Sequence, residues 1–237
     1  MHICPISREQ LLVFLNKGSK VAEIGVANGE FSRHILDQTS PNELHLIDPW
    51  EHQETDDYQA DINNVSANEQ NSRFQGIQEK FQAELDKGIV HIHRDYSYNA
   101  AKKFTPKYFD WIYIDGMHTK EAVLQDLNDY WSLIKDDGFV LGHDYANNPG
   151  ALTQGFGVIE AVDEFVIKNE AIFFAITIDS FPTFMLAKKG NTQFERLLQK
   201  LQYALPLLIE IRDYPSNKKF EQKYFKLEGK EGLTFSF

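Results

Sequence analysis

The sequence is poor in cysteine, in long apolar runs and in positive charge. Cys4 is the only cysteine, which excludes an intrachain disulfide and a cysteine-rich metal site. No run of about 18 apolar residues occurs, so we expect no membrane-spanning helix and no membrane partner. The formal net charge of -11 disfavours nucleic acid as a partner, because acidic surfaces repel phosphate backbones. The opening segment lacks a basic start and a long apolar run, so we expect no secretory signal and a cytoplasmic location.

What the chain does contain is an alternation of short apolar runs and helix-like segments. Its 237 residues, 42% of them hydrophobic, suit one sizeable core. Such alternation is typical of βαβ units around a parallel sheet. The expected strands are 20–24, 43–48, 89–93, 109–114, 139–142, 172–178 and 183–187. The expected helices are 30–37, 69–86, 99–104, 120–134 and 157–168.

The last two expected strands are joined by a short connection around residues 179–182. A parallel crossover needs about a dozen residues, so this pair is expected to form an antiparallel hairpin at the end of the sheet. The fold class is therefore α/β: a Rossmann-like, seven-stranded, mostly parallel sheet with helices on both faces. Residues 1–190 are expected to form the domain. Residues 191–237, an apolar helix and a tail with a hairpin around 228–232, are expected to extend it without forming an independent domain.

The sharpest motif is the segment from Glu23 to Gly29, in which a strand leads through Gly25, Ala27 and Gly29 into a helix. Small residues allow a tight turn and a close approach of the backbone to a ligand. Dinucleotide-binding turns have the spacing G-x-G-x-x-G, whereas this segment reads E-x-G-x-x-x-G. A carboxylate at Glu23 repels pyrophosphate and favours a ligand with an ammonium group. S-adenosylmethionine, with a sulfonium and no phosphate, fits that requirement; the alternative is a tight turn without a ligand.

Acidic residues follow the next two expected strands. Asp48 lies about 20 residues past the glycines, at the position suited to ribose hydroxyls. Asp95 and Tyr96 follow the third strand, where Asp95 can accept a hydrogen bond from the adenine amino group and Tyr96 can line the base. For Asp95 the alternative interpretation is the N-cap of a helix. These residues complete the expected cofactor site.

Two further strand ends carry Asp115, His118, His143 and Asp144. Ligands in open parallel sheets bind beyond the carboxyl ends of the strands, so these side chains are expected to converge. Two carboxylates repel each other unless a proton or a metal intervenes, and magnesium would relieve that repulsion. Alternatively, an Asp–His cluster orients the substrate without a metal. His118 is the candidate general base for a substrate hydroxyl. Asp115 and Asp144 are also expected to be catalytic residues.

In this ordered set of motifs the chain resembles class I S-adenosylmethionine-dependent methyltransferases over roughly residues 18–188. It is most similar to the small-molecule O-methyltransferase-like branch, through Asp115-Gly-Met-His118 and Gly142-His-Asp-Tyr145. The resemblance implies methyl transfer to a small hydroxylated acceptor such as a sugar or natural product. It also implies a metal held by Asp115, His143 and Asp144, and cofactor contacts that include Asp115. The position of His143 is usually acidic in the family, and histidine there favours manganese or another transition metal over magnesium.

Two other functions are compatible with parts of this pattern. A nicotinamide-dependent oxidoreductase shares the Rossmann sheet, but the glycine spacing and the short hairpin argue against it. A non-catalytic binding module would not need Asp115, His118 and Asp144. The polar segment 51–73 and the tail after residue 190 are expected to shape the acceptor pocket or a homodimer contact.

Overall fold

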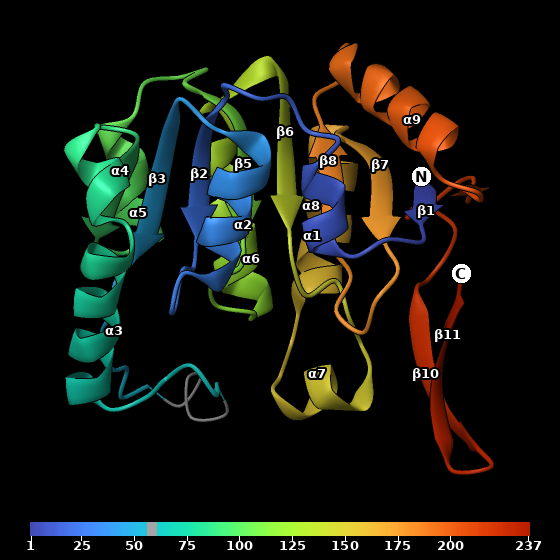
Figure 1. Ribbon diagram of the computed structural model, residues 1–237. Coiled ribbons are helices and arrows are strands. Elements are labelled where there is room, and N and C mark those ends of the chain that lie inside the picture. The colour runs from blue at the N-terminus through green and yellow to red at the C-terminus, as the bar shows by residue number, and fades with distance from the viewer. Residues whose placement is uncertain (56–60) are drawn as a thin grey trace.

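The computed structural model describes residues 1–55 and 61–237, and these form one large sheet with helices on both faces (Figure 1). The strands of this sheet are β1 (His2–Cys4), β2 (Lys20–Ile24), β3 (Glu43–Asp48), β4 (Val90–Arg94), β5 (Phe109–Ile114), β6 (Ile134–Gly142), β7 (Ile172–Thr177), β8 (Phe184–Ala187) and β9 (Ile209–Glu210). Their spatial order is β4-β3-β2-β5-β6-β8-β7-β1-β9. The α/β architecture with a mostly parallel sheet is confirmed.

The expected strand count was wrong, because the described residues form a nine-stranded sheet and not a seven-stranded one. The two extra strands are β1, which pairs in parallel with β7, and β9, which pairs antiparallel with β1. They cover the edge of β7, so the β7–β8 hairpin is antiparallel as expected but does not end the sheet. Strands of two or three residues are too short to show the alternating pattern by which a strand is recognised.

Helices cover both faces of the sheet and enclose two apolar clusters. Their bounds are α1 (Arg8–Leu12), α2 (Glu30–Thr39), α3 (Ala67–Lys80), α4 (Gln82–Asp86), α5 (Ser97–Ala100), a 3-10 turn (Ala101–Lys103), α6 (Lys120–Trp131), α7 (Pro149–Thr153), α8 (Val158–Asn169) and α9 (Gln193–Ala204). Figure 1 shows α1 and α2 in front of the sheet and α6 and α8 behind it. The expected helix 69–86 is divided at Phe81 into α3 and α4.

The register of the central strands aligns the residues that follow them. Ile24 of β2 lies opposite both Ile47 of β3 and Ile114 of β5, and Ile114 lies opposite Gly142 of β6. The residues just beyond these positions, Gly25, Asp48, Asp115 and His143, therefore form a row at the carboxyl edge of the sheet. This is the lower edge in Figure 1. It is the edge at which parallel sheets bind their ligands.

The chain after residue 190 packs back onto the sheet and ends in a hairpin. Leu197, Leu198 and Leu201 of α9 are buried in the cluster that also contains α1 and α2. Strands β10 (Glu221–Leu227) and β11 (Lys230–Ser236) form the expected terminal hairpin, which extends from the lower right of the molecule in Figure 1. Among the described helices, none has the length and apolar character needed to cross a membrane.

Candidate active site

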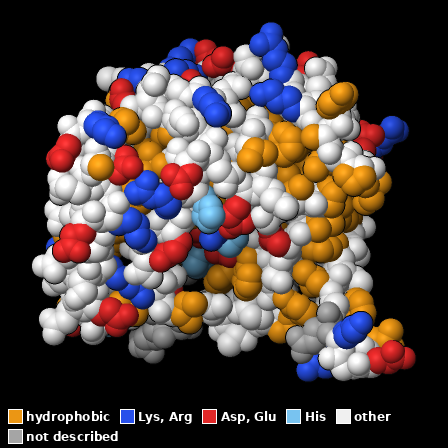
Figure 2. Space-filling view, viewed as in Figure 1, with side chains coloured by type: hydrophobic (Ala, Val, Ile, Leu, Met, Phe, Trp, Pro, Cys, Tyr) orange, Lys and Arg blue, Asp and Glu red, His pale blue; other side chains and the backbone are white. Residues whose placement is uncertain are grey.

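A cavity of about 500 Å³ opens at the carboxyl edge of the sheet. Of the predicted site residues, it is lined by Glu23, Gly25, Ala27, Asp48, Tyr96, Asp115, His118, His143 and Asp144. Gly29 and Asp95 are not among its lining residues. Figure 2 shows histidine side chains beside acidic and basic ones in a hollow near the middle of the face turned toward the viewer. Residues 56–60 of the expected loop 51–73 lie outside the described residues, whereas Glu51, Gln53 and Asn63 of the same loop line the cavity.

Glu23 contributes a carboxyl group that is almost fully buried, with 2% of the residue exposed. The Ser32 hydroxyl donates a hydrogen bond of 2.5 Å to Glu23 Oε2. Burial raises the pKa of Glu23 to about 8, and this effect outweighs the hydrogen bond from Ser32. The site therefore contains an acidic group whose ionised form is poorly compensated by the surrounding side chains. A cationic group of a ligand would compensate it.

Asp48 fixes the loop that follows β2. Its Oδ2 accepts hydrogen bonds from the backbone N–H groups of Val26 and Ala27, at 2.9 and 3.0 Å. Its Oδ1 accepts one from the N–H of Trp50 at 2.7 Å, and Trp50 Nε1 donates in turn to the carbonyl of Ala27 at 2.9 Å. The Asp48 side chain thus holds the loop in place while it borders the cavity. Sequence reasoning assigned it only a contact with ribose.

The two glycines are required by the packing of the chain against itself. Gly25 has φ +84°, and a Cβ there would lie 2.0 Å from the carbonyl oxygen of Asp115. Gly29 has φ +70°, and a Cβ there would lie 2.6 Å from Ile77 Cδ1 on α3. The sequence-based explanation for these glycines, close approach of the backbone to a ligand, does not apply to Gly29, because Gly29 packs against α3. At Gly25 the close neighbour is the end of β5.

Asp95 and Tyr96 occupy different positions relative to the cavity. Asp95 Oδ2 lies 2.8 Å from Lys103 Nζ, and Asp95 Oδ1 accepts hydrogen bonds from the Tyr96 N–H and from Asn99. The hydrogen bond from Lys103 lowers the pKa of Asp95. Asp95 lines a second, smaller hollow, whereas Tyr96 lines the large cavity and donates its hydroxyl to Glu51 at 2.9 Å. The structure therefore directs the Asp95 carboxylate toward the start of α5.

The predicted catalytic side chains form one compact cluster. His118 Nε2 lies 2.7 Å from Asp144 Oδ2 and 3.9 Å from Asp115 Oδ1. His143 Nδ1 lies 3.1 Å from Asp144 Oδ1 and 3.5 Å from Asp115 Oδ1. Two imidazoles thus lie between the two carboxylates, as the expected convergence of these strand ends requires.

The cluster is electrostatically coupled. Burial lowers the pKa values of His118 and His143, but the nearby carboxylates of Asp115 and Asp144 outweigh it and raise them to about 10 and about 9. Burial likewise opposes ionisation of Asp115 and Asp144, yet the histidines lower the pKa of both carboxyl groups. At neutral pH the mutual repulsion of the carboxylates is therefore relieved by protonated imidazoles.

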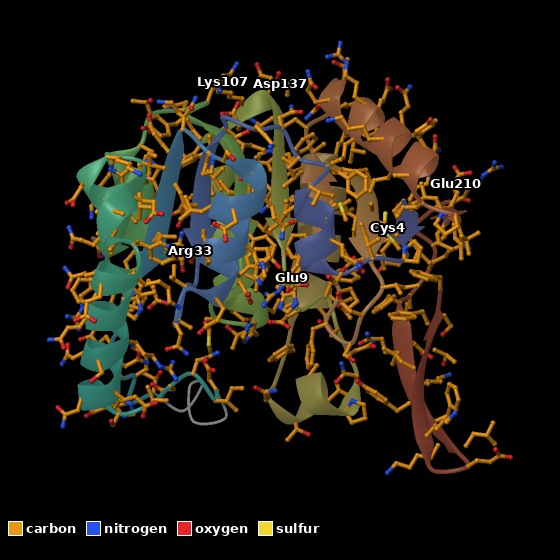
Figure 3. All side chains as sticks on the ribbon, viewed as in Figure 1. Cys4, Glu9, Arg33, Lys107, Asp137 and Glu210 are labelled. Atoms are coloured by element: carbon orange, nitrogen blue, oxygen red, sulfur yellow. The ribbon has the colours of Figure 1, made fainter. Side chains whose placement is uncertain are left out.

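Arg8 and Asp126 are two charged cavity residues that sequence reasoning missed. Arg8 on α1 places Nη1 2.7 Å from Asp115 Oδ2, and its guanidinium lies 4.6 Å from the ring centroid of Phe31. The next residue, Glu9, is labelled in Figure 3 at the lower end of α1. Asp126 on α6 is buried and lines the cavity, and burial raises its pKa to about 7. Neither residue follows a strand, so no motif pointed to it.

The cluster has the donor types that a divalent cation requires. Single ligand atoms of Asp115, His118 and Asp144 all lie within 4.8 Å of one another. His118 Nε2 is buried and has no well-aligned hydrogen bond, despite its short distance to Asp144. The predicted set named His143 in place of His118. Both imidazoles lie next to the same two carboxylates, so an ion could be held by the two carboxylates and by one imidazole that has released its proton.

Comparison with known proteins agrees with this geometry. Residues 22–145, just over half of the chain, match the profile of the family described as "Methyltransferase domain". No curated protein matches the chain. Three solved structures share the fold: a proposed rRNA methylase from Clostridium thermocellum, a proposed methyltransferase from Streptococcus mutans in complex with SAH, and a proposed caffeoyl-CoA O-methyltransferase from Staphylococcus aureus.

The likeness to these structures is one of fold, because sequence identity is low. The C. thermocellum structure has a TM-score of 0.53 at 14% identity, over 77% of this chain and 93% of its own. The S. mutans structure has 0.51 at 14%, over 78% and 99%, and the S. aureus structure 0.51 at 16%, over 78% and 86%. With the family match and the acidic, glycine-lined cavity at the carboxyl edge of the sheet, the chain belongs to the methyltransferase-domain family and is a class I S-adenosylmethionine-dependent methyltransferase.

Proposed function

We propose that this enzyme transfers a methyl group to a hydroxyl oxygen of a small acceptor. The observation that carries the proposal is the shared cavity: the buried acid Glu23 and the loop-holding Asp48 line the same space as His118 and Asp144. A methyl donor held by the first pair would lie beside a proton acceptor supplied by the second. Such positioning is the main contribution that an enzyme makes to a direct transfer.

The donor half of the cavity is built from Glu23, Asp48 and Tyr96. Glu23 is the proposed partner of the ammonium group of S-adenosylmethionine, whose methyl carbon is carried on a positively charged sulfur. Asp48 has lone pairs left for the ribose hydroxyls beyond those used by the backbone N–H groups. Tyr96 borders the space available to the base. An adenine contact from Asp95 requires its carboxylate to leave Lys103.

His118 is the proposed general base. Its Nε2 faces Asp144 at 2.7 Å, which leaves Nδ1 as the nitrogen that receives the proton of the acceptor hydroxyl. The acceptor oxygen forms a bond to the methyl carbon as the bond from that carbon to sulfur breaks, and the hydroxyl proton passes to the imidazole. Because the two carboxylates favour imidazolium, His118 must first release a proton to solvent.

A divalent cation, magnesium or manganese, is proposed to bind between Asp115 and Asp144 together with His143, which leaves His118 to act as the base. It would lower the pKa of the acceptor hydroxyl and fix its direction. Arg8 already neutralises Asp115 on one side. Even without an ion, therefore, the Asp115 carboxylate binds Arg8, and the carboxylates of Asp115 and Asp144 bind the two imidazoles.

The acceptor half of the cavity is partly aromatic. The ring of Phe156 stacks on His118 at a centroid distance of 4.3 Å, and Phe181 lies 6.1 Å from Phe156. A cavity of about 500 Å³ that also holds a nucleoside leaves room for a small acceptor only. A nucleic-acid acceptor is not proposed, because the chain carries a net charge of -11.

The test is methyl transfer from S-adenosylmethionine to a panel of hydroxylated small molecules, followed as formation of S-adenosylhomocysteine with and without Mg²⁺ or Mn²⁺. His118→Ala is expected to lower the rate at least about a hundredfold, the usual contribution of a general base. His34→Ala, at an exposed position of α2, is the matched control and is expected to leave the rate unchanged. Equal rates in the two variants would remove His118 from the mechanism.

A further inference from the structure

A second group of metal-ligand side chains lies away from the cavity, on β3 and β4. It consists of Glu43 and His45 on β3 and His91 on the neighbouring strand, with single ligand atoms all within 4.8 Å of one another. Glu43 is the first residue of β3, whereas Asp48, which lines the cavity, is the last. The group thus lies toward the amino-terminal edge of the sheet, the edge near which Figure 3 labels Lys107 and Asp137.

The spacing of two of these groups allows either a hydrogen bond or a shared ion. His45 Nε2 lies 3.3 Å from Glu43 Oε2. An N–H···O hydrogen bond usually measures about 2.9–3.0 Å. Two ligands bound to one tetrahedral zinc ion at about 2.0–2.1 Å lie about 3.3 Å apart. The His91 ring stacks on the His45 ring with the centroids 4.7 Å apart, and one of its nitrogens lies within 4.8 Å of the other two ligand atoms.

Neighbouring side chains already orient these groups as outer partners orient metal ligands. Lys20 Nζ binds the other oxygen of Glu43, Oε1, at 2.7 Å, and the Tyr108 hydroxyl donates to Oε2. His45 Nδ1 lies 3.0 Å from His93 Nε2, a contact in which one nitrogen must be unprotonated. When Nδ1 of His45 donates to His93, its Nε2 presents a lone pair toward Glu43.

We propose that Glu43, His45 and His91 bind one divalent transition-metal ion of the zinc class. Two imidazoles and one carboxylate form a ligand set that zinc accepts, with water at the remaining position, whereas magnesium prefers oxygen ligands. His45 and His91 are register partners on β3 and β4. The ion therefore links the edge strand β4 to its neighbour and stabilises that side of the sheet.

The test is calorimetric titration of Zn²⁺ into the His118→Ala/Asp144→Ala protein, in which the catalytic cluster no longer competes for the ion. One equivalent is expected to bind and to raise the unfolding temperature. Adding His91→Ala is expected to weaken binding at least about a hundredfold and to abolish the thermal shift. His93→Ala, which alters only an outer partner, is expected to weaken it by about tenfold.

The matched control is His34→Ala in the same background, since His34 is exposed on α2. It is expected to bind zinc unchanged. In the wild-type background, His91→Ala is expected to remove one equivalent of bound zinc, so the test does not depend on the double variant folding. Zinc binding that is equal in the His91→Ala and His34→Ala proteins, or magnesium binding as tight as zinc binding at this group, would overturn the proposal.

Discussion

Glu23 is the residue whose environment is hardest to explain without a ligand. Its carboxyl group is buried, its hydrogen bond comes from a neutral serine, and its pKa is raised to about 8. An acidic group kept in such a place favours a positively charged partner. We expect the amino group of the methyl donor to supply that charge, and this pairing is open to direct measurement.

Cofactor binding is expected to release a proton from Glu23. In the free enzyme the Glu23 carboxyl is protonated below about pH 8, and a bound ammonium group favours the ionised form, so its pKa falls on binding. Affinity is therefore expected to rise with pH by about tenfold per unit below that value, down to the pKa in the complex, and to level off above it. Calorimetry at pH 7 in buffers of different ionisation enthalpy measures the proton. Glu23→Gln is expected to eliminate the release; release that persists in this variant would contradict the assignment.

Gly25→Ala is expected to destabilise the protein by about 2–4 kcal/mol, because the residue has positive φ and its Cβ would meet the Asp115 carbonyl. Gly76→Ala is the matched control, since nothing lies within 4 Å of its Cβ position and it lies inside α3. That change is expected to be stabilising by about 0.5–1 kcal/mol. Urea unfolding of both variants decides the point. A similar free energy of unfolding in the two would show that the approach of β2 to β5 is not as close as described.

At the scale of residues, sequence reasoning succeeded where a residue follows a strand. Asp48, Asp115 and His143 were placed together because strand register carries them to one edge. It failed for Arg8, which reaches the cavity from α1 by a tertiary contact with Asp115 that no local pattern encodes. Asp95 shows the other limit: the strand end was located correctly, but Lys103 determines where its carboxylate points.

At the scale of elements, long periodic segments were predicted and short ones were not. The strands 20–24, 43–48 and 109–114 have the expected bounds, because each is a run of apolar residues long enough to recognise. β1 and β9 exist only through pairing with β7 and with each other. β6 begins at Ile134, within the expected helix 120–134, because tertiary pairing with β5 outweighs the helical pattern there.

The tail is expected to depend on the domain for its structure. Leu201 of α9 is fully buried against the sheet, so Leu201→Ala is expected to lower the free energy of unfolding by about 2–5 kcal/mol. Leu207, 56% exposed just beyond α9, is the control, and its change to Ala is expected to cost less than about 0.5 kcal/mol. Denaturant unfolding is expected to remain a single transition. A separate transition for residues 191–237 would instead identify an independent unit.

At the scale of the whole molecule, the opposite edges of one sheet carry different chemistry. The carboxyl edge holds the cavity proposed for the cofactor and the acceptor, and the amino-terminal edge near β4 holds the proposed zinc group. Magnesium or manganese is expected at the first, where carboxylates dominate, and zinc at the second, where imidazoles dominate. The chain as a whole has a formal net charge of -11. Long-range attraction by this surface favours cationic or neutral small molecules over polyanions.

This surface charge predicts that nucleic acid does not bind. Fluorescence anisotropy with labelled RNA at low salt is expected to show no complex, because the chain has 35 acidic and 24 basic residues. Low salt is the most permissive condition, since screening by ions weakens electrostatic binding. Binding that falls steeply as salt is added would reveal a basic patch and would make RNA the acceptor to test first.

The most direct test of the account is a calorimetric comparison of S-adenosylmethionine with NAD. One molecule of S-adenosylmethionine is expected to bind per chain with micromolar affinity. Asp48→Ala is expected to weaken that binding at least about tenfold, because the change removes the hydrogen bonds that hold the loop as well as the proposed ribose contact. NAD is expected to give no heat, since the Asp48 carboxylate repels its pyrophosphate. Clear binding of NAD together with no heat from S-adenosylmethionine would contradict the account.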